Sequence, residues 1–380
     1  MYVRCIENLT ELDPYRAAWD ALQGGCVFRR WSWLSTWWRH YGELGGQRRL
    51  RVYLAFNGQS AEPASLAGVL PCYVEASWSQ GRVLRPLGGG EVCSDHLGLL
   101  TAPAFAEAAA AAIATHLAAS DDWDLLDFSA VDADDAATAK LFDGLALNDC
   151  TTSRLLADRC WVIDLPPTWE EFLALQSKSH RKQLRQLDAR VLQSDRARWK
   201  CINSSDDFAT AWSTLVDLHQ RRRKSLDEPG CFASRTWAAF HWEVAQKLLV
   251  EGRLRLSLVE LDGKAIAAEY HLAGARTTYA YQGGLDPDRR ADEPGQLSTI
   301  CSIKQAIAEG HAHFDLLRGD EPYKAHWRAT PRQAVRLVAV PPRMWPKLRH
   351  GTWNSARHVA HVTRQLTGLL KAPGSAGGPT

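Results

Sequence analysis

Two short groups of polar side chains in the second half of the chain could carry proton-transfer chemistry. In the first group, Glu269 and His271 stand two residues apart in a segment whose apolar residues alternate. Alternate side chains of a strand share one face, so these two would lie side by side, opposite the apolar face. A carboxylate beside an imidazole can act as a general base. A solvated strand face is the alternative interpretation.

The second group follows an apolar segment over residues 313–317 and crowds charges into one turn, Arg318-Gly319-Asp320-Glu321-Pro322-Tyr323-Lys324. Asp320 or Glu321 is a second candidate for the general base. Arg318 could bind a substrate, and Lys324 could hold a phosphate or an oxyanion. A salt-bridged surface turn, with Tyr323 as a packed aromatic, is the alternative.

The elements that must position these groups can be predicted from residues 252–327. Asp262-Gly263 predicts a tight hairpin turn, because a primed turn needs positive φ. A helix over 296–309, with Gly310 as its C-cap, begins beside the end of a strand, where its free N–H groups can hold an anion such as a pyrophosphate. Strands are expected at 254–258, 266–272, 277–282 and 313–317.

Basic residues gather on a single long helix that the sequence predicts over 168–193, with Thr168 as its N-cap. Arg181, Lys182 and Arg185 could form a wall for a phosphorylated substrate such as a nucleotide-sugar, a lipid-linked sugar or a tRNA. The alternative is a solvated helix face.

In the first half, Asp95 and His96 follow three consecutive glycines, 88–90. They could belong to a substrate-binding site between the two halves, whereas a lone histidine is more often structural than catalytic. The sequence contains no metal-ligand spacing, no Walker loop and no dinucleotide-binding glycine motif, so we expect no metal.

Composition points to a two-domain globular protein. The chain has 380 residues, of which 46% are hydrophobic and 23% charged, with a net charge of +2. Nine scattered cysteines indicate a reducing compartment, and residues 1–20 lack a signal-peptide pattern, so we expect a cytoplasmic protein. The predicted class is α+β, with domains at 1–157 and 158–342, each a mostly antiparallel sheet flanked by helices.

The predicted third region, 343–380, combines a basic amphipathic helix with a disordered tail. The helix either packs on the body or makes a peripheral contact with an anionic membrane surface, at the inner membrane.

Several short motifs together follow one family pattern. They are Asp262-Gly263-Lys264, Asp286-Pro287, Pro294-Gly295, the block Phe314–Lys324 and Trp327, with Trp37-Trp38, Leu84–Gly88 and Ser94–His96 in the first half. In these motifs, residues 1–340 resemble the bacterial acetyltransferase-like family related to the CelD proteins of cellulose biosynthesis. That family is part of the Gcn5-related N-acetyltransferase (GNAT) superfamily and is related to the FemAB-type aminoacyl transferases, which implies two GNAT-like units in tandem.

The resemblance implies acyl transfer from a thioester, acetyl-CoA or another acyl-CoA, to an amine. Tyr323 then corresponds to a tyrosine that protonates the leaving thiolate, and Lys324 could contact the donor. The donor pyrophosphate would lie on the loop that enters the helix, at Arg290, Gly295, Gln296, Leu297 and Ser298. This loop has one glycine at the turn where the superfamily has more, and Asp292 and Glu293 would repel a phosphate if they pointed inward.

Three functions follow as expectations. The first is an N-acyltransferase acting on an amino group of a cell-envelope or exopolysaccharide precursor, a small-molecule or lipid-linked sugar acceptor. The second is a FemAB-like transferase that takes its donor from charged tRNA. The third is a non-catalytic accessory protein of polysaccharide biosynthesis. None of the three involves DNA.

Overall fold

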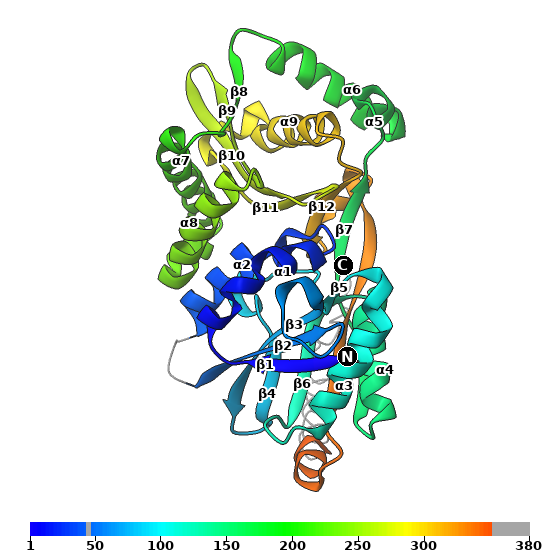
Figure 1. Cartoon of the computed structure of the whole chain (residues 1–380). Helices are drawn as coiled ribbons and strands as arrows, with labels where there is room; N and C mark the ends of the chain where they lie inside the picture. The colour runs from blue at the N-terminus through cyan, green and yellow to red at the C-terminus, as the bar shows by residue number, and fades with distance from the viewer. Residues whose placement is uncertain (43–46, 352–380) are drawn as a thin grey trace, which may run out of the picture.

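The structure is a computed structural model, and it describes residues 1–42 and 47–351. Within these residues, one sheet of 13 strands passes through both halves of an elongated molecule (Figure 1). The strand order is β1-β2-β3-β4-β6-β13-β7-β12-β11-β10-β9-β8, and β5 pairs with β3. The pairs β4–β6 and β11–β12 are parallel, and the other pairs are antiparallel. The α+β class with largely antiparallel pairing is therefore confirmed.

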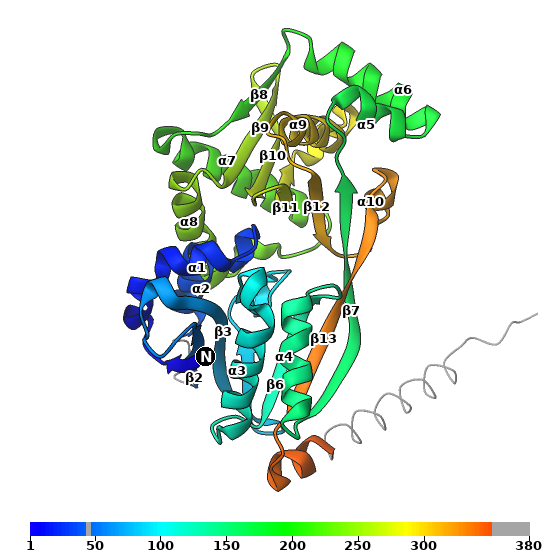
Figure 2. The ribbon, with the colours of Figure 1, turned by 45° about the vertical axis from the view of Figure 1, so that its right-hand side comes forward.

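The N-terminal unit is a sheet with helices on both faces (Figure 2). The tryptophan-rich α2 and α1 pack on one face, and α3 and α4 bury alanine, leucine and phenylalanine side chains on the other. The strands are β1 (Tyr2–Ile6), β2 (Arg48–Phe56), β3 (Leu66–Ser77), β4 (Gly81–Pro86), β5 (Leu100–Thr101) and β6 (Leu125–Asp132). The helices are α1 (Arg16–Leu22), α2 (Trp31–Trp37), α3 (Ala106–Ala119) and α4 (Ala136–Leu147).

The C-terminal unit repeats this layering. Helices α7 and α8 cover one face of its sheet, and α9, α5 and α6 lie on the other (Figure 1). The strands are β8 (Ala197–Cys201), β9 (Leu254–Leu261), β10 (Lys264–Ala273), β11 (Thr277–Leu285) and β12 (His313–Arg318). The helices are α5 (Trp169–Leu175), α6 (Lys178–Leu187), α7 (Ser205–Lys224), α8 (Arg235–Val250), α9 (Pro294–Ala308) and α10 (Pro322–His326).

Two long strands, β7 (Thr151–Asp164) and β13 (Thr330–Val340), join the units (Figure 2). β13 pairs with β6 of the N-terminal unit on one side and with β7 on the other, while the end of β7 pairs with β12. Buried Asp127 on β6 accepts hydrogen bonds from Arg336 on β13 and Arg85 on β4, each at 2.7 Å. Burial alone would raise the pKa of Asp127, but the two guanidinium groups lower it. The last strand therefore completes the sheet of the first unit.

Several sequence expectations need correction. The single helix predicted over 168–193 is broken: α5 ends at Leu175, and Ser177 accepts the N-capping bond of α6. The apolar residues of 160–165 alone predict a short strand, but they are the end of β7, which begins nine residues earlier at Thr151. β13 was not anticipated. The proposed boundary at 157/158 lies inside β7 and stays a prediction.

The structure describes only part of the predicted C-terminal region, 343–380. Residues 344–351 are helical, and Arg343 donates to the backbone oxygens of Asp121 and Trp123. The remainder of the predicted amphipathic helix, 352–380, lies outside the described residues, so membrane contact stays a prediction. No helix in the ranges 1–42 and 47–351 is long and apolar enough to cross a membrane.

Gly284 marks a close approach between β11 and α7. A Cβ at this position would lie 2.6 Å from the backbone nitrogen of His219 and 2.9 Å from Leu218 Cβ. We expect Gly284→Ala to lower the free energy of unfolding by about 2 kcal/mol, because α7 must move off the sheet. Chemical denaturation measures this, with Gly89→Ala as the control, where the new Cβ would be 3.8 Å from its nearest neighbour. Equal stability of the two variants would contradict the assignment.

Candidate active site

Strands β11 and β12 part after a short paired stretch. They pair only from Thr277 and His313 to Tyr279 and Asp315, after which β11 continues along β10 to Leu285. The β10–β11 register skips Tyr281, which is a β-bulge beside the point of parting. Bulges next to sheet openings re-aim side chains and leave backbone groups free, so this edge of β11 can bind an extended ligand.

β12 turns away because side chains replace its sheet partner. Leu317 has a left-handed backbone, with φ of +58°, and its N–H donates to Asp315 Oδ1 at 2.7 Å. The next N–H, of Arg318, donates to Asp95 Oδ2 at 3.2 Å. Lys324 Nζ donates to the three successive carbonyls of residues 317–319, at 3.1, 2.8 and 3.1 Å. The backbone of this segment is thus satisfied without β11.

The N-terminus of α9 lies beside the end of β11. Glu293 has φ of +53° and precedes Pro294 at the first helical position. A Cβ on Gly295 would be 3.3 Å from Leu285 Cδ1 of β11. The two acidic side chains of the loop have partners: Asp292 binds Arg289 at 2.5 Å, and Glu293 accepts from Gln183 of α6 at 2.8 Å. Neither carboxylate caps α9, so the N–H groups of its first turn remain available to an anion.

Glu269 and His271 lie side by side on the α9 face of β10, as predicted. Glu269 accepts a hydrogen bond from Ser298 Oγ of α9 at 2.5 Å, and its other oxygen is 3.1 Å from His271 Nε2. The side chain of Glu269 is 13% exposed. A Cβ on exposed Gly283, which stands on β11 beyond the point of parting, would be 2.7 Å from Glu269 Oε2. This carboxylate is therefore held at the edge of the gap.

Tyr323 on α10 is 53% exposed. Its partial burial raises the pKa of the hydroxyl, and the negative charges of Glu321 and Glu269 raise it further. Tyr323 therefore stays protonated at neutral pH, which is the state that a proton donor needs.

The remaining charges of the 318–324 turn have structural contacts. The Asp320 carboxylate accepts from Arg159 at 2.9 Å and from Trp161 at 3.0 Å, and the bond from Arg159 leads the lowering of its pKa. Glu321 forms an ion pair at 3.0 Å with Lys324, which is 2% exposed. These contacts make Asp320 a poor proton acceptor and leave the Lys324 ammonium fully bonded.

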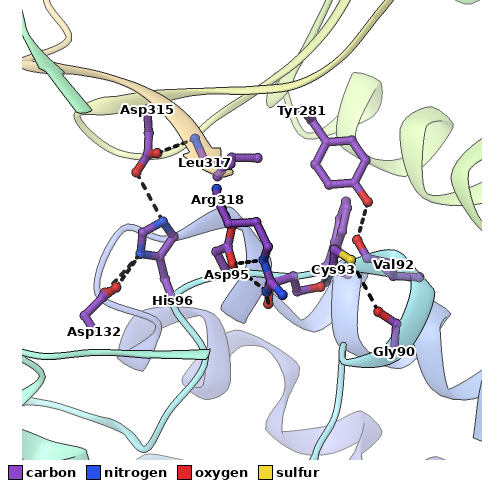
Figure 3. A network of polar contacts seen from close by, with 12 residues as sticks. Gly90, Val92, Cys93, Asp95, His96, Asp132, Tyr281, Asp315, Leu317 and Arg318 are labelled. Carbon is purple, nitrogen blue, oxygen red and sulfur yellow. Dashed lines mark hydrogen bonds and ion pairs between the residues drawn. The ribbon is translucent and has the colours of Figure 1, made fainter. Parts of the chain in front are cut away.

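Arg318, Asp95 and His96 meet at the contact between the units (Figure 3). Arg318 Nε donates to Asp95 Oδ1 at 2.6 Å and Nη2 to the Ser94 carbonyl at 3.2 Å. His96 stands between two carboxylates, with Nδ1 2.8 Å from Asp132 and Nε2 3.2 Å from Asp315. Burial alone would lower the pKa of His96, but these two carboxylates raise it well above its ordinary value.

The basic residues of α6 lie at the surface near the α9 N-terminus. Arg181 donates to the Ala174 carbonyl at 3.3 Å, Arg185 pairs with Glu170 at 3.0 Å, and Lys182 is exposed. The Gln183–Glu293 bond places α6 against the start of α9. Arg290 is exposed, Gln296 is partly buried, and Leu297 and Ser298 are buried in the first turns of α9.

Sequence analysis did not identify one buried group of hydrogen-bonded side chains. His241 of α8 is fully buried, with Nδ1 3.2 Å from the Tyr270 hydroxyl and Nε2 3.1 Å from that of Tyr281. Burial lowers the pKa of His241 well below its ordinary value, so the imidazole is neutral. The position of His241 among the apolar residues of α8 is a visible signal, but its tyrosine partners lie 29 and 40 residues away.

Comparisons with known proteins agree with this architecture. Residues 178–325 match the acetyltransferase (GNAT) domain family. The chain is similar to the crystal structure of FemX, with a TM-score of 0.63 and 11% identity over 90% of this chain and 98% of that one. It is also similar to the C-terminal domain of a putative lysylphosphatidylglycerol synthetase from Agrobacterium fabrum, with a TM-score of 0.54 and 10% identity over 92% and 96% of the two chains.

A conserved protein of unknown function from Bacteroides thetaiotaomicron VPI-5482 has a TM-score of 0.52 and 10% identity, over 89% of this chain and 100% of that one. No curated protein matches the chain. At these identities the structural similarities show the fold alone, which is GNAT-like, and residues 178–325 are similar to the acetyltransferase (GNAT) domain family. In the described part of the chain, no group of three or more His, Cys, Asp or Glu residues could hold a metal ion.

The contacts of Lys324 predict a structural role. We expect Lys324→Met to lower the free energy of unfolding by about 3 kcal/mol, since buried carbonyls of residues 317–319 would lose their donor. Urea unfolding measures the change, and Lys140→Met, at an exposed ion pair with Glu107, is the control. If Lys324→Met instead kept its stability and only weakened donor binding, the cofactor role first expected for Lys324 would hold.

Proposed function

We propose that this chain is an N-acyltransferase that moves an acyl group from acyl-CoA to an amine in the gap between β11 and β12. The observation that carries the proposal is the parting of these strands after Tyr279 and Asp315, beside the bulge at Tyr281 and the start of α9. A gap with one free strand edge and a helix N-terminus at its end suits a donor whose extended arm leads to a pyrophosphate.

The residues present fit such a donor. The backbone of Gly295, with the exposed Arg290, would hold the pyrophosphate, because the nearby carboxylates of Asp292 and Glu293 contact other side chains and do not cap the helix. The free edge of β11 would bind the amide groups of the pantetheine arm. The donor supplies an activated acyl carbon as a thioester, and the chain's own residues orient it and move protons.

The proton transfers divide between two side chains. Glu269, fixed by Ser298 and His271, takes a proton from the amine as the new bond from nitrogen to the acyl carbon forms. When the bond from that carbon to sulfur breaks, Tyr323 gives its proton to the thiolate, and its raised pKa keeps the proton available at neutral pH. One proton leaves the amine and one reaches the thiol, so the reaction balances.

The acceptor class follows from the resemblance to the CelD-related family. We infer an amino group of a cell-envelope or exopolysaccharide precursor, presented as a small molecule or a lipid-linked sugar on the cytoplasmic side. The gap adjoins the contact between the units, where Asp95, His96 and Arg318 lie, so an acceptor can reach it between them.

A second candidate, an aminoacyl transferase with a tRNA-bound donor, has its own support. The similarity to FemX extends over 90% of this chain, including both units. Exposed Lys182 and the partly exposed Arg181 of α6 lie beside the start of α9, where an RNA backbone could be bound. The two candidates share the fold and differ in the donor.

Isothermal calorimetry with acetyl-CoA and with free CoA tests the proposal. We expect micromolar binding that Gly295→Val weakens about tenfold or more, because the added side chain meets Leu285. Absence of binding at millimolar ligand would reject the acyl-CoA donor. A charged-tRNA binding assay would then separate the aminoacyl transferase from a non-catalytic accessory protein of polysaccharide biosynthesis.

The catalytic assignment predicts a loss of turnover without a loss of donor affinity. We expect Glu269→Gln to lower kcat about 10²- to 10⁴-fold, and Tyr323→Phe to lower it by a smaller factor. Thiol release with a panel of amine acceptors measures the rates. Glu260→Gln, on the adjacent strand β9, is the control and should leave the rate unchanged. Wild-type rates in both site variants would refute the roles of Glu269 and Tyr323.

A further inference from the structure

We propose that the loop of residues 88–96 in the N-terminal unit sets the width of the gap between β11 and β12, with Asp95 as a positioning residue. The claim about acyl transfer rests on the proposed function. The claim about the two strands stands on their contacts alone.

The 88–96 loop is a fixed part of the N-terminal unit. Trp33 Nε1 donates to Ser94 Oγ at 2.8 Å, and Trp37 Nε1 donates to the Gly89 carbonyl at 3.0 Å. Both tryptophans are buried on α2. Gly88 has φ of +93°, and a Cβ there would be 3.1 Å from Ser94 Oγ, so a larger residue would disturb the loop. The loop therefore behaves as a rigid support.

On one side, the loop holds β11 at its bulge. The Tyr281 hydroxyl donates to the Val92 carbonyl at 2.5 Å. From the other direction, His241 of α8 approaches the same hydroxyl and in turn contacts Tyr270 of β10. Tyr281 is thus fixed between the loop and the core of its own unit, at the residue where β11 loses its partner.

On the other side, the loop holds β12 just after it leaves β11 (Figure 3). Asp95, which is 3% exposed, binds both the backbone N–H and the guanidinium of Arg318. His96 reaches Asp315, whose carboxylate also fixes the left-handed Leu317. Within the five residues Val92–His96, the loop contacts both edges of the gap.

Polar contacts add to the apolar packing that fixes this spacing. Val92 and Leu317 belong to one buried hydrophobic cluster, whereas a pocket of about 210 Å³ on another side of the loop is lined by His96, Asp132 and Asp315 among others, so the contacts on that side are polar. Without the Asp95 carboxylate, the Arg318 N–H would lack its acceptor, and residues 316–319 would be free to move relative to β11. A donor bound between the strands would then lose its fixed walls.

Hydrogen–deuterium exchange of the free protein tests whether the 88–96 loop holds the two strands in place. In Asp95→Ala, we expect amide exchange of residues 316–319 to rise about tenfold or more, with β2, β3 and residues 280–285 unchanged because Tyr281 keeps its bond to Val92. Asp95→Asn, which keeps an acceptor oxygen, should give a smaller rise. The control is Glu251→Gln, which weakens another contact between the units, the 2.9 Å pair with Arg30, away from both strands.

Kinetics and calorimetry test the positioning role. We expect Asp95→Ala to raise the donor KM and the Kd for free CoA about tenfold, with a smaller effect on kcat, while Glu251→Gln leaves both unchanged.

Unchanged exchange in Asp95→Ala would overturn the proposal. If Asp95→Ala fails to fold, Tyr281→Phe replaces it and should speed exchange of 280–285 alone; unchanged exchange there would equally overturn it. Faster exchange in a protein that binds no CoA would uphold the loop's role and reject the acyl-CoA function.

Discussion

The site depends on how the chain provides hydrogen-bond partners for backbone groups that a neighbouring strand would otherwise pair. Where β12 leaves β11, two N–H groups and three carbonyls need partners, and each one left buried and unpaired would cost about 1–3 kcal/mol. Asp315, Asp95 and Lys324 supply those partners from three different elements. The opening is therefore built by side chains, and its shape follows from where those side chains are anchored.

These side chains can hold β12 in place only if the two units keep a fixed relative position. β13 begins beside β7 at the C-terminal unit and ends between β6 and β7, so one sheet passes through the whole molecule. Asp127, bound by Arg85 and Arg336, ties this strand into the N-terminal unit. Buried ion pairs add little net stability compared with apolar packing, but they select one register. A fixed register in β13 keeps the 88–96 loop opposite the parted strands.

Local patterns could be predicted from the sequence, and distant pairings could not. Asp262 and Gly263 have φ of 54° and 75°, as the hairpin turn requires, and Glu269 and His271 share a strand face because of a two-residue period. The break between α5 and α6 was missed, since the basic and apolar periodicity continues through Ser177. β13 pairs with strands about 200 residues away, and no local signal reveals such partners.

The contacts of the site residues could likewise not be predicted from local sequence patterns. The charges at 318–324 indicated chemistry, because functional sites often concentrate ionisable groups. The structure gives three of them another purpose: Asp320 binds Arg159 and Trp161, Arg318 binds Asp95, and Lys324 binds carbonyls. Spacing alone cannot separate a group that reacts from a group that holds the backbone in place, since both need charge.

A group that reacts differs from a group that only holds the backbone in whether its charge is already bonded within the chain. Lys324 and Asp95 have their hydrogen-bonding capacity taken up by the chain, so they define the walls of the gap. Glu269 accepts a bond from the neutral hydroxyl of Ser298 and lies beside His271, and these contacts orient its carboxylate. Tyr323 is partly exposed and keeps its proton. In the proposed reaction, an oriented carboxylate would take the proton from the amine and a protonated phenol would supply one to the thiolate, and acyl transfer to an amine needs both.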